Sequence, residues 1–367
     1  MAEPDKPRRD PRFERLTATP ELFLKDFNPE RDLAVLSPMS EASYRDSVFM
    51  DDRLVRSETR DLALSLNALG RLWQHSGAAA RVIHYIGHMG HCGSTLLSRI
   101  LGELPGLHSL REPPVLVALS RALRYLESPG FGLTAFEWSQ LLELAALMMQ
   151  RTWRASDVSV LKPTSAAGNL LPYLMNRTGD ERAVLLYVHL ADWLPIMLRP
   201  DTRRETGLFA KDFRLADFAA VAGDEVSSPA SPGELAAMTW LLQAREFAEL
   251  LDDPRTSPRV RLLHFDTLLA HPVPVIRALC DWFGKPSPSE DITAVAGRLM
   301  KTDAKRPGQA YGAAARAAEL ERLRATETME IERGLAWARA AARNPAFSGL
   351  AERLPPAKAS STPSSGA

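Results

Sequence analysis

Residues 83–101 combine the residue types and spacing that could bind a phosphate group. An apolar segment leads into a glycine-rich turn, two hydroxyl residues and an amphipathic helical pattern. Glycine lets the backbone approach a ligand closely, and the free N–H groups at a helix start favour an anion. The hydroxyl groups can cap the helix and donate to phosphate oxygens. The turn contains Gly87, Gly90 and Gly93, and Ser94 and Thr95 come directly after it. This spacing predicts a phosphate cradle; the alternative is an ordinary strand–helix turn with a capping Ser-Thr pair.

The residues after Gly93 indicate the kind of phosphate. An ATP-type loop needs a lysine between its last glycine and the hydroxyl residue, and here Gly93 runs directly into Ser94. The order from His91 to Thr95 instead resembles the 5′-phosphosulfate loop of the sulfotransferase superfamily, commonly Lys/Arg-Ser-Gly-Thr-Thr. The resemblance implies 3′-phosphoadenylyl sulfate as co-substrate and no metal. It also implies a set of donor-binding residues: Gly90, Cys92, Gly93, Ser94 and Thr95.

Residues 105–113 are similar to the family's run of helix, Pro-Gly, strand and glutamate. The resemblance gives Glu112 the role of general base, since a carboxylate beside the acceptor hydroxyl can take its proton during attack on sulfur. The alternative is structural: Glu112 pairs with Arg111 or caps the helix that opens at Pro113 and Pro114.

Lys162 ends the apolar segment 158–161, at a place where α/β folds gather their ligands. It resembles the family's Lys-x-Pro lysine. The resemblance implies that Lys162, together with His91, stabilises the charge that develops on the leaving phosphate. The alternative is a solvated lysine at the end of a strand.

Two later segments extend the resemblance. Residues 259–272, together with 280–284, resemble the family's late-strand signature, in which Asp266 is expected to cap or brace the next helix. Lys305 and Arg306, beside a glycine, look like a reduced form of the basic loop that closes over the donor's 3′-phosphate. Solvated side chains are the alternative for these two.

The sequence departs from the family at three positions. His91 stands where the family has a basic residue. His189 and Met197 stand where the family's third-strand signature has an arginine and a serine that hold the 3′-phosphate. Methionine cannot bind phosphate as a hydroxyl does. We therefore count His189 and Arg199 as donor-binding candidates, with Arg203 and Arg204 as possible substitutes.

Strands alternate with helices between these motifs. Four short segments rich in β-branched or aromatic residues are expected to be buried strands, at 81–87, 158–161, 183–188 and 260–265. Long helices are expected at 135–154, 233–251, 275–283 and 316–343. This alternation predicts an α/β fold with a central parallel sheet of about four or five strands, covered by helices on both faces. The resemblance specifies it as the P-loop nucleoside-triphosphate-hydrolase-like sandwich.

The chain is predicted to form one domain over residues 17–353, between disordered tails at 1–16 and 354–367. Residues 17–80 carry a mostly helical pattern and are predicted to be an N-terminal helical extension.

Composition limits the classes of partner. Among 367 residues, 45 basic side chains balance 45 acidic ones, so no overall field attracts nucleic acid or an anionic membrane. Two cysteines are too few for a disulfide framework. The histidines near the glycine turn lack metal-ligand spacing, and no metal site is expected. The N-terminus lacks a secretory pattern and no segment is apolar enough to span a membrane, which predicts a cytoplasmic protein.

The predicted function is sulfonate transfer from 3′-phosphoadenylyl sulfate to a hydroxyl or amine acceptor, a small molecule or a peptide. Two alternatives stay open: a kinase-like phosphotransferase that uses ATP and Mg²⁺, and a non-catalytic binding protein with a sulfotransferase-like shape. A homodimer is possible.

Overall fold

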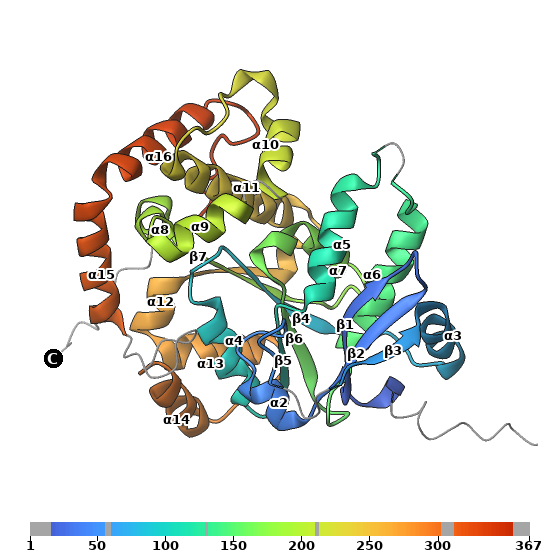
Figure 1. Cartoon of the computed structure of the whole chain (residues 1–367). Coiled ribbons are helices and arrows are strands. Elements are labelled where there is room, and N and C mark those ends of the chain that lie inside the picture. The colour runs from blue at the N-terminus through green and yellow to red at the C-terminus, as the bar shows by residue number, and fades with distance from the viewer. Residues whose placement is uncertain (1–15, 56–59, 129–130, 210–212, 302–311, 355–367) are drawn as a thin grey trace, which may run out of the picture.

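The computed structural model describes residues 16–55, 60–128, 131–209, 213–301 and 312–354. At its centre is a five-stranded sheet in the order β5-β6-β4-β7-β8, in which every neighbouring pair is parallel. The strands are β4 (Ile83–His88), β5 (Leu107–Arg111), β6 (Val158–Lys162), β7 (Ala183–Tyr187) and β8 (Val260–His264). Helices surround this sheet (Figure 1), which confirms the predicted α/β fold with a central parallel sheet.

The sheet is buried on both faces, as the apolar strand sequences require. Every residue of β4, β5, β6 and β7 is buried. On one face the buried His84 ring stacks on Phe283 with ring centroids 4.8 Å apart. On the other face Gly87 lies against Leu171 and Phe247.

The helices that surround the sheet include those predicted at 135–154, 233–251 and 275–283, with adjusted ends. Those that precede β8 are α4 (Ser94–Glu103), α5 (Pro114–Tyr125), α6 (Ala135–Met149), α7 (Leu171–Leu174), α8 (Leu190–Met197), α9 (Pro200–Phe209), α10 (Leu215–Ala222) and α11 (Pro232–Asp252). Those that come after it are α12 (Phe265–Ala270), α13 (Pro272–Trp282), α14 (Ser289–Leu299), α15 (Ala313–Thr326) and α16 (Thr328–Ala341). In the described part of the chain, none of the helices has the length and apolar character to cross a membrane.

The strand order has a switch point between β4 and β7. The chain leaves β4 through α4 toward β5, whereas it leaves β7 in the opposite direction toward β8. Neighbouring parallel strands whose connections diverge leave a crevice at their carboxyl ends, where α/β proteins bind ligands. The glycine turn after β4 and the segment after β7 therefore flank the expected ligand position.

The predicted helical extension over residues 17–80 is wrong. Its described part forms a three-stranded antiparallel sheet of β1 (Leu22–Asn28), β2 (Leu33–Pro38) and β3 (Leu62–Ser65), with the helices α2 (Glu41–Asp46) and α3 (Leu66–Ser76). Periodicity does not separate short apolar strands from helical turns, and here long-range pairing decided the outcome. Figure 1 shows this small sheet beside α5 and α6.

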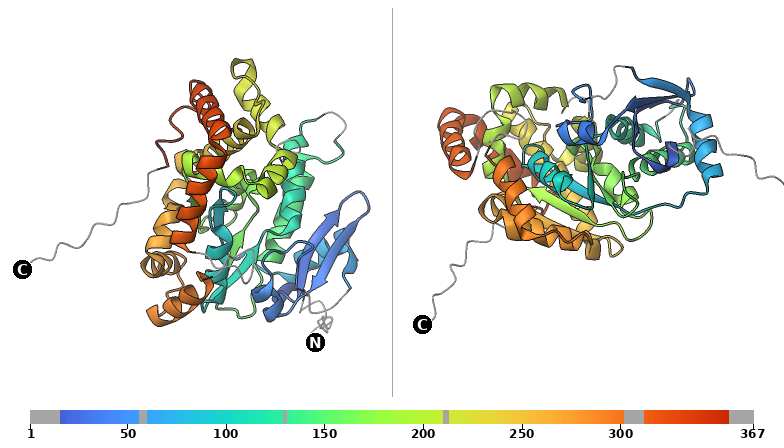
Figure 2. Two further views of the ribbon diagram at one scale, coloured as in Figure 1. Left: turned by 60° about the vertical axis from the view of Figure 1, so that its left-hand side comes forward. Right: turned by 90° about the horizontal axis from the view of Figure 1, so that it is seen from below.

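The predicted helix over 316–343 is instead two helices, α15 and α16. They meet at Glu327, whose φ of −112° and ψ of 17° are not helical. Figure 2 shows both helices on the side of the molecule away from β1–β3.

Candidate functional site

Three strands end in side chains that lie close together. His88 ends β4, Lys162 ends β6, and Glu112 comes directly after β5. Lys162 Nζ forms an ion pair with Glu112 Oε1 and lies 3.4 Å from His88 Nε2, which is 4.0 Å from the same carboxylate oxygen. The Lys162 side chain is fully buried, whereas 21% of the Glu112 side chain is exposed. A buried cation is thus coupled to a carboxylate that an incoming molecule can reach.

Glu112 is held in an uncommon backbone conformation. Its φ is 56°, in the left-handed region that non-glycine residues seldom adopt, and its N–H donates to the Lys162 carbonyl at 2.7 Å. Such residues persist where the surroundings fix them, and they cluster at functional sites. The conformation keeps the carboxylate at the end of β6.

Arg111 does not pair with Glu112, so that structural alternative is wrong. The buried Arg111 guanidinium donates instead to the carbonyls of Ser47 (2.8 Å), Arg45 (3.3 Å) and Tyr44. The Met50 N–H in turn donates to the Arg111 carbonyl at 2.9 Å. These bonds fasten the N-terminal region to β5.

The same attachment brings aromatic and basic groups to the cluster. The Phe49 ring centroid lies 5.7 Å from Lys162 Nζ, and the Arg53 guanidinium lies 3.9 Å from the same centroid. Neither residue belongs to a recognisable motif, because the region before residue 80 contains none, and sequence reasoning therefore missed both.

The glycine turn requires glycine at its last position. Gly93 has a φ of 78°, and an added Cβ would lie 1.9 Å from a ring carbon of Phe265. α4 begins at the next residue, with Ser94 and Thr95 buried in its first turn. Thr95 Oγ1 is buried and has no hydrogen-bond partner within the described ranges. A buried hydroxyl without a partner at a helix start fits a phosphate or sulfonate oxygen.

The buried Cys92 side chain braces this turn from inside. Its thiol points into the core, donating to the Met89 carbonyl at 2.7 Å and lying 3.3 Å from that of Leu186. The Gly90 carbonyl accepts a bond from Trp193 Nε1 of α8. The turn is therefore linked to β7 through Leu186 and to α8 through Trp193.

His91 and Arg199, predicted from distant parts of the sequence, lie in contact. Arg199 Nη2 is 3.3 Å from His91 Nδ1, and Arg199 Nη1 donates to Glu319 Oε1 at 3.2 Å. Because a guanidinium can only donate, Nδ1 must accept and the His91 hydrogen lies on Nε2. Arg199, itself paired with Glu319, therefore brings a guanidinium group beside the turn.

His189 lies among further groups with unused hydrogen-bonding atoms. Its ring is 5.1 Å from that of His264, and Nε2 of both rings is buried without a partner in the described part of the chain. Arg316 Nη2 is also buried without a hydrogen-bond partner among the described residues. The Arg316 guanidinium lies 4.9 Å from the Phe265 ring centroid. Burial lowers the pKa of His264, and the nearby Asp266 opposes this. Sequence reasoning missed His264 and Arg316 as site residues, since neither matches a motif position for the donor.

Asp266 contacts α15, a later helix than the next one that it was expected to cap or brace. Its Oδ1 lies 3.3 Å from Nε of Arg316 on α15. The helix that contains it is capped by His264 Nδ1, which accepts from the Asp266 N–H at 3.2 Å. Lys305 and Arg306 lie outside the described residues.

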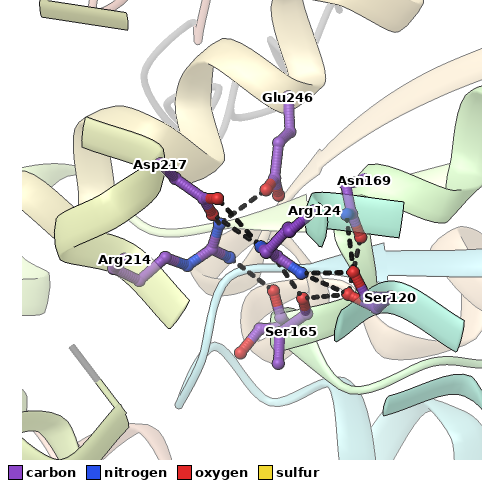
Figure 3. A network of polar contacts seen from close by, with 8 residues as sticks. Ser120, Arg124, Ser165, Asn169, Arg214, Asp217 and Glu246 are labelled. Carbon is purple, nitrogen blue, oxygen red and sulfur yellow. Dashed lines mark hydrogen bonds and ion pairs between the residues drawn. The ribbon is translucent and has the colours of Figure 1, made fainter. Parts of the chain in front are cut away.

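The turn after β6 is held by a buried polar cluster (Figure 3). Arg214 donates to the Ser165 carbonyl at 2.7 Å and to Glu246 at 2.6 Å. Arg124 donates to Asp217 at 2.9 Å and to the Ala166 carbonyl at 3.2 Å. The cluster, which sequence reasoning missed, fixes the chain three to four residues beyond Lys162.

Over the described ranges, no three histidine, cysteine, aspartate or glutamate side chains are grouped closely enough to hold a metal ion.

Comparison with known proteins gives matches only among solved structures. No family model matches the chain, and no curated protein does. A sulfotransferase domain from the curacin biosynthetic pathway matches with 14% identity and a TM-score of 0.40, over 69% of this chain and 99% of that one. A sulfotransferase from Mycobacterium tuberculosis matches with 16% identity and a TM-score of 0.39, over 70% and 80% of the two chains. Retinol dehydratase, solved with androsterone and the inactive cofactor PAP, matches with 11% identity and a TM-score of 0.31, over 86% and 96%. The chain is thus similar in structure to solved sulfotransferases, and its own site residues carry the functional proposal.

Proposed function

We propose that the protein transfers a sulfonate group from 3′-phosphoadenylyl sulfate to a hydroxyl or amine acceptor. One observation carries the proposal: the Glu112–Lys162 ion pair lies at the same sheet edge as a glycine turn whose Thr95 hydroxyl is buried without a partner in the described chain. A base, a buried cation and an anion cradle are the three elements that sulfonate transfer requires.

The donor's 5′-phosphosulfate would lie on the turn after β4. The backbone N–H groups of Cys92, Gly93 and Ser94 and the hydroxyls of Ser94 and Thr95 would donate to its oxygens. Arg199 and the Nε2–H of His91 would add positive charge and a further donor. The 3′-phosphorylated nucleoside would extend from the ends of β4 and β7 toward His189, His264 and Arg316, whose buried nitrogens can donate to it. Gly90, Lys305 and Arg306 complete the proposed donor-binding set.

In the transfer step, Glu112 would accept the proton of the acceptor hydroxyl or amine as the acceptor atom attacks sulfur. The new bond to sulfur forms while the bond between sulfur and the bridging oxygen breaks. The electron pair of that bond leaves on the 5′-phosphate of 3′-phosphoadenosine 5′-phosphate. Lys162 would stabilise the charge that develops there.

The ion pair suggests how the donor prepares the base. While Lys162 holds Glu112, the carboxylate is a weak proton acceptor because its charge is neutralised. The anionic donor would attract Lys162 toward the bridging oxygen. That shift would leave Glu112 with its exposed face toward the acceptor, which would enter past Phe49 and Arg53.

Calorimetry with 3′-phosphoadenosine 5′-phosphate, and separately with ATP and Mg²⁺, tests the donor. We expect micromolar binding of the 3′-phosphorylated nucleotide without metal, the ordinary range for an enzyme substrate. Preference for ATP with Mg²⁺ would reject sulfonate transfer in favour of a kinase-like activity. Failure of both nucleotides to bind would reject it in favour of a non-catalytic binding protein.

A further inference from the structure

Ser165 lies opposite the glycine turn and was not suggested by any motif. It is the first residue of the short 3-10 helix Ser165–Leu170, three positions after Lys162. A Cβ added to Gly90 would lie 3.7 Å from Ser165 Oγ, with no other described atom within 4 Å apart from those of Gly90 and its two chain neighbours. The Ser165 hydroxyl therefore borders the open side of the glycine turn, between the turn and the end of β6.

The backbone that carries Ser165 is held at three carbonyls. His88 Nε2 lies 2.9 Å from the Pro163 carbonyl, Arg214 donates to that of Ser165, and Arg124 and Ser120 donate to that of Ala166. In Figure 3 the dashed line from Arg214 reaches the Ser165 carbonyl, and none reaches its hydroxyl. Over the described residues, no hydrogen-bond partner is found for that hydroxyl.

The four donors come from three elements of the fold. His88 ends β4, Ser120 and Arg124 lie on α5, and Arg214 precedes α10, where its side chain is fully buried. Burial lowers the pKa of His88 to about 3, so the ring is neutral near pH 7 and its Nε2–H can donate to Pro163. Arg214 and Arg124 are neutralised by Glu246 and Asp217. Burying these charged pairs costs desolvation free energy. In return, the cluster holds the backbone around Ser165 in a single conformation.

We propose that the Ser165 hydroxyl donates a hydrogen bond to the transferring sulfonate, and that the cluster of Arg214, Glu246, Arg124 and Asp217 is the device that positions it. This inference rests on the proposed function. Ser165 is assigned to the sulfonate rather than to the 5′-phosphate because it faces Gly90 and comes soon after Lys162, whereas Ser94 and Thr95 at the start of α4 serve the phosphate.

The assignment predicts a selective loss of donor affinity. In Ser165→Ala, we expect the Kd of 3′-phosphoadenylyl sulfate to rise about ten- to a hundredfold, the range for a hydrogen bond to a charged group. The Kd of 3′-phosphoadenosine 5′-phosphate, which has no sulfonate, should stay within about twofold of the wild-type value. Ser139→Ala, at an exposed serine of α6, is the matched control and should change neither constant.

Arg214→Met tests the positioning cluster. Arg214→Met should raise the Kd of the sulfonated donor by a similar factor. The double variant with Ser165→Ala should have nearly the same Kd as either single variant, because both substitutions remove the same contact with the sulfonate. Full additivity of the two effects would overturn the positioning role. If Arg214→Met does not fold, Glu246→Gln, which keeps the shape but removes the charge, takes its place.

The outcomes separate the two proposals. An unchanged donor Kd in Ser165→Ala, or an equal loss for both nucleotides, overturns the role of Ser165 and leaves the proposed function standing. If the wild-type protein binds neither nucleotide, the proposed function fails, and inorganic sulfate becomes the probe. A rise in Tm with sulfate that is smaller in Ser165→Ala than in Ser139→Ala would support Ser165 as an anion contact, and equal rises would overturn it.

Discussion

Lys162 and Glu112 form an ion pair between the ends of the neighbouring strands β6 and β5, and only the glutamate is open to solvent. The parallel register sets Arg111 beside Lys162, so the residue after Arg111 lies where the lysine side chain can reach it. The left-handed backbone at Glu112 then turns the carboxylate toward the lysine. Because Glu112 is reached by solvent, Lys162 can leave it for an entering anion while water solvates the carboxylate. If both groups were buried, the same exchange would leave an unpaired charge without solvent.

Glu112→Gln should abolish most transfer while leaving nucleotide binding intact. The amide can still accept a hydrogen bond from Lys162 but cannot take a proton, so the turnover number should fall by about 10²- to 10⁴-fold. The Kd of 3′-phosphoadenosine 5′-phosphate should change little. Turnover is measured with any acceptor found active with the wild-type protein, and binding by calorimetry.

The matched control is Glu103→Gln, which removes a carboxylate paired with Arg298 at the far end of α4. It should leave turnover unchanged. Wild-type turnover in Glu112→Gln would remove Glu112 from the role of base.

Thr95→Val should weaken donor binding without weakening the fold. The substitution keeps the shape and removes a buried hydroxyl that has no partner elsewhere in the described structure, so the free energy of unfolding should stay within about 1 kcal/mol or rise. The affinity for 3′-phosphoadenosine 5′-phosphate should fall about tenfold or more, because a hydrogen bond to a charged oxygen is lost. Urea unfolding and calorimetry give the two quantities.

Thr239→Val, in α11, controls for the change of a buried threonine. Its hydroxyl donates to the Leu235 carbonyl within the helix, so nucleotide affinity should be unaffected. Equal affinity in Thr95→Val and the wild-type protein would mean that the turn after β4 does not hold the phosphate through this hydroxyl.

The sequence predicted the centre of the fold well because its signals there are local. The four predicted strands are apolar runs bounded by turns, and each lies in the observed sheet within about two residues of its expected ends. The glycine turn was equally readable, since Gly93 and the two hydroxyls after it are consecutive. The site residues Glu112 and Lys162 came from resemblance, and the structure places both at one sheet edge.

The features that the sequence did not predict depend on contacts between distant segments. The strands β1–β3 form by pairing with one another and packing on α5 and α6, which no local pattern encodes. The positioning of Ser165 by Arg214 links residues 49 positions apart, across segments without a motif. The contact of Arg199 with His91 spans 108 positions and was not predicted, because Arg199 was named only as a candidate for binding the 3′-phosphate.

Arg199→Met decides which arginine serves the donor. If Arg199 supplies the charge beside His91, its removal should raise the Kd of 3′-phosphoadenosine 5′-phosphate about tenfold or more at low salt. The difference from the wild-type protein should shrink as salt is raised, because screening weakens the lost interaction. Arg203→Met is the comparison, since Arg203 pairs with Glu327 away from the turn. A larger loss in Arg203→Met than in Arg199→Met would contradict the assignment.

Acid should destabilise the protein through its buried histidines. Burial lowers the pKa of His84 to about 4 and those of His88 and His108 to about 3, from an ordinary value of 6.5. Between pH 6.5 and these values the unfolded chain binds protons that the folded chain does not, so the free energy of unfolding falls as pH falls. Above pH 6.5 the histidines do not lower the free energy of unfolding. Below pH 6.5 each histidine lowers the free energy of unfolding by up to about 1.4 kcal/mol per pH unit.

His108→Phe isolates one of these protons at a position remote from the transfer site. The His108 ring packs against Tyr44 at 4.7 Å between centroids, and its buried Nε2 has no partner in the described chain, so phenylalanine can replace it with little loss. The slope of unfolding free energy against pH, from urea curves between pH 6 and pH 4, should decrease by about 1.4 kcal/mol per pH unit in the variant. Parallel slopes for variant and wild type would mean that His108 is protonated in the folded protein over this range, in conflict with its burial beside Arg111 and Arg151.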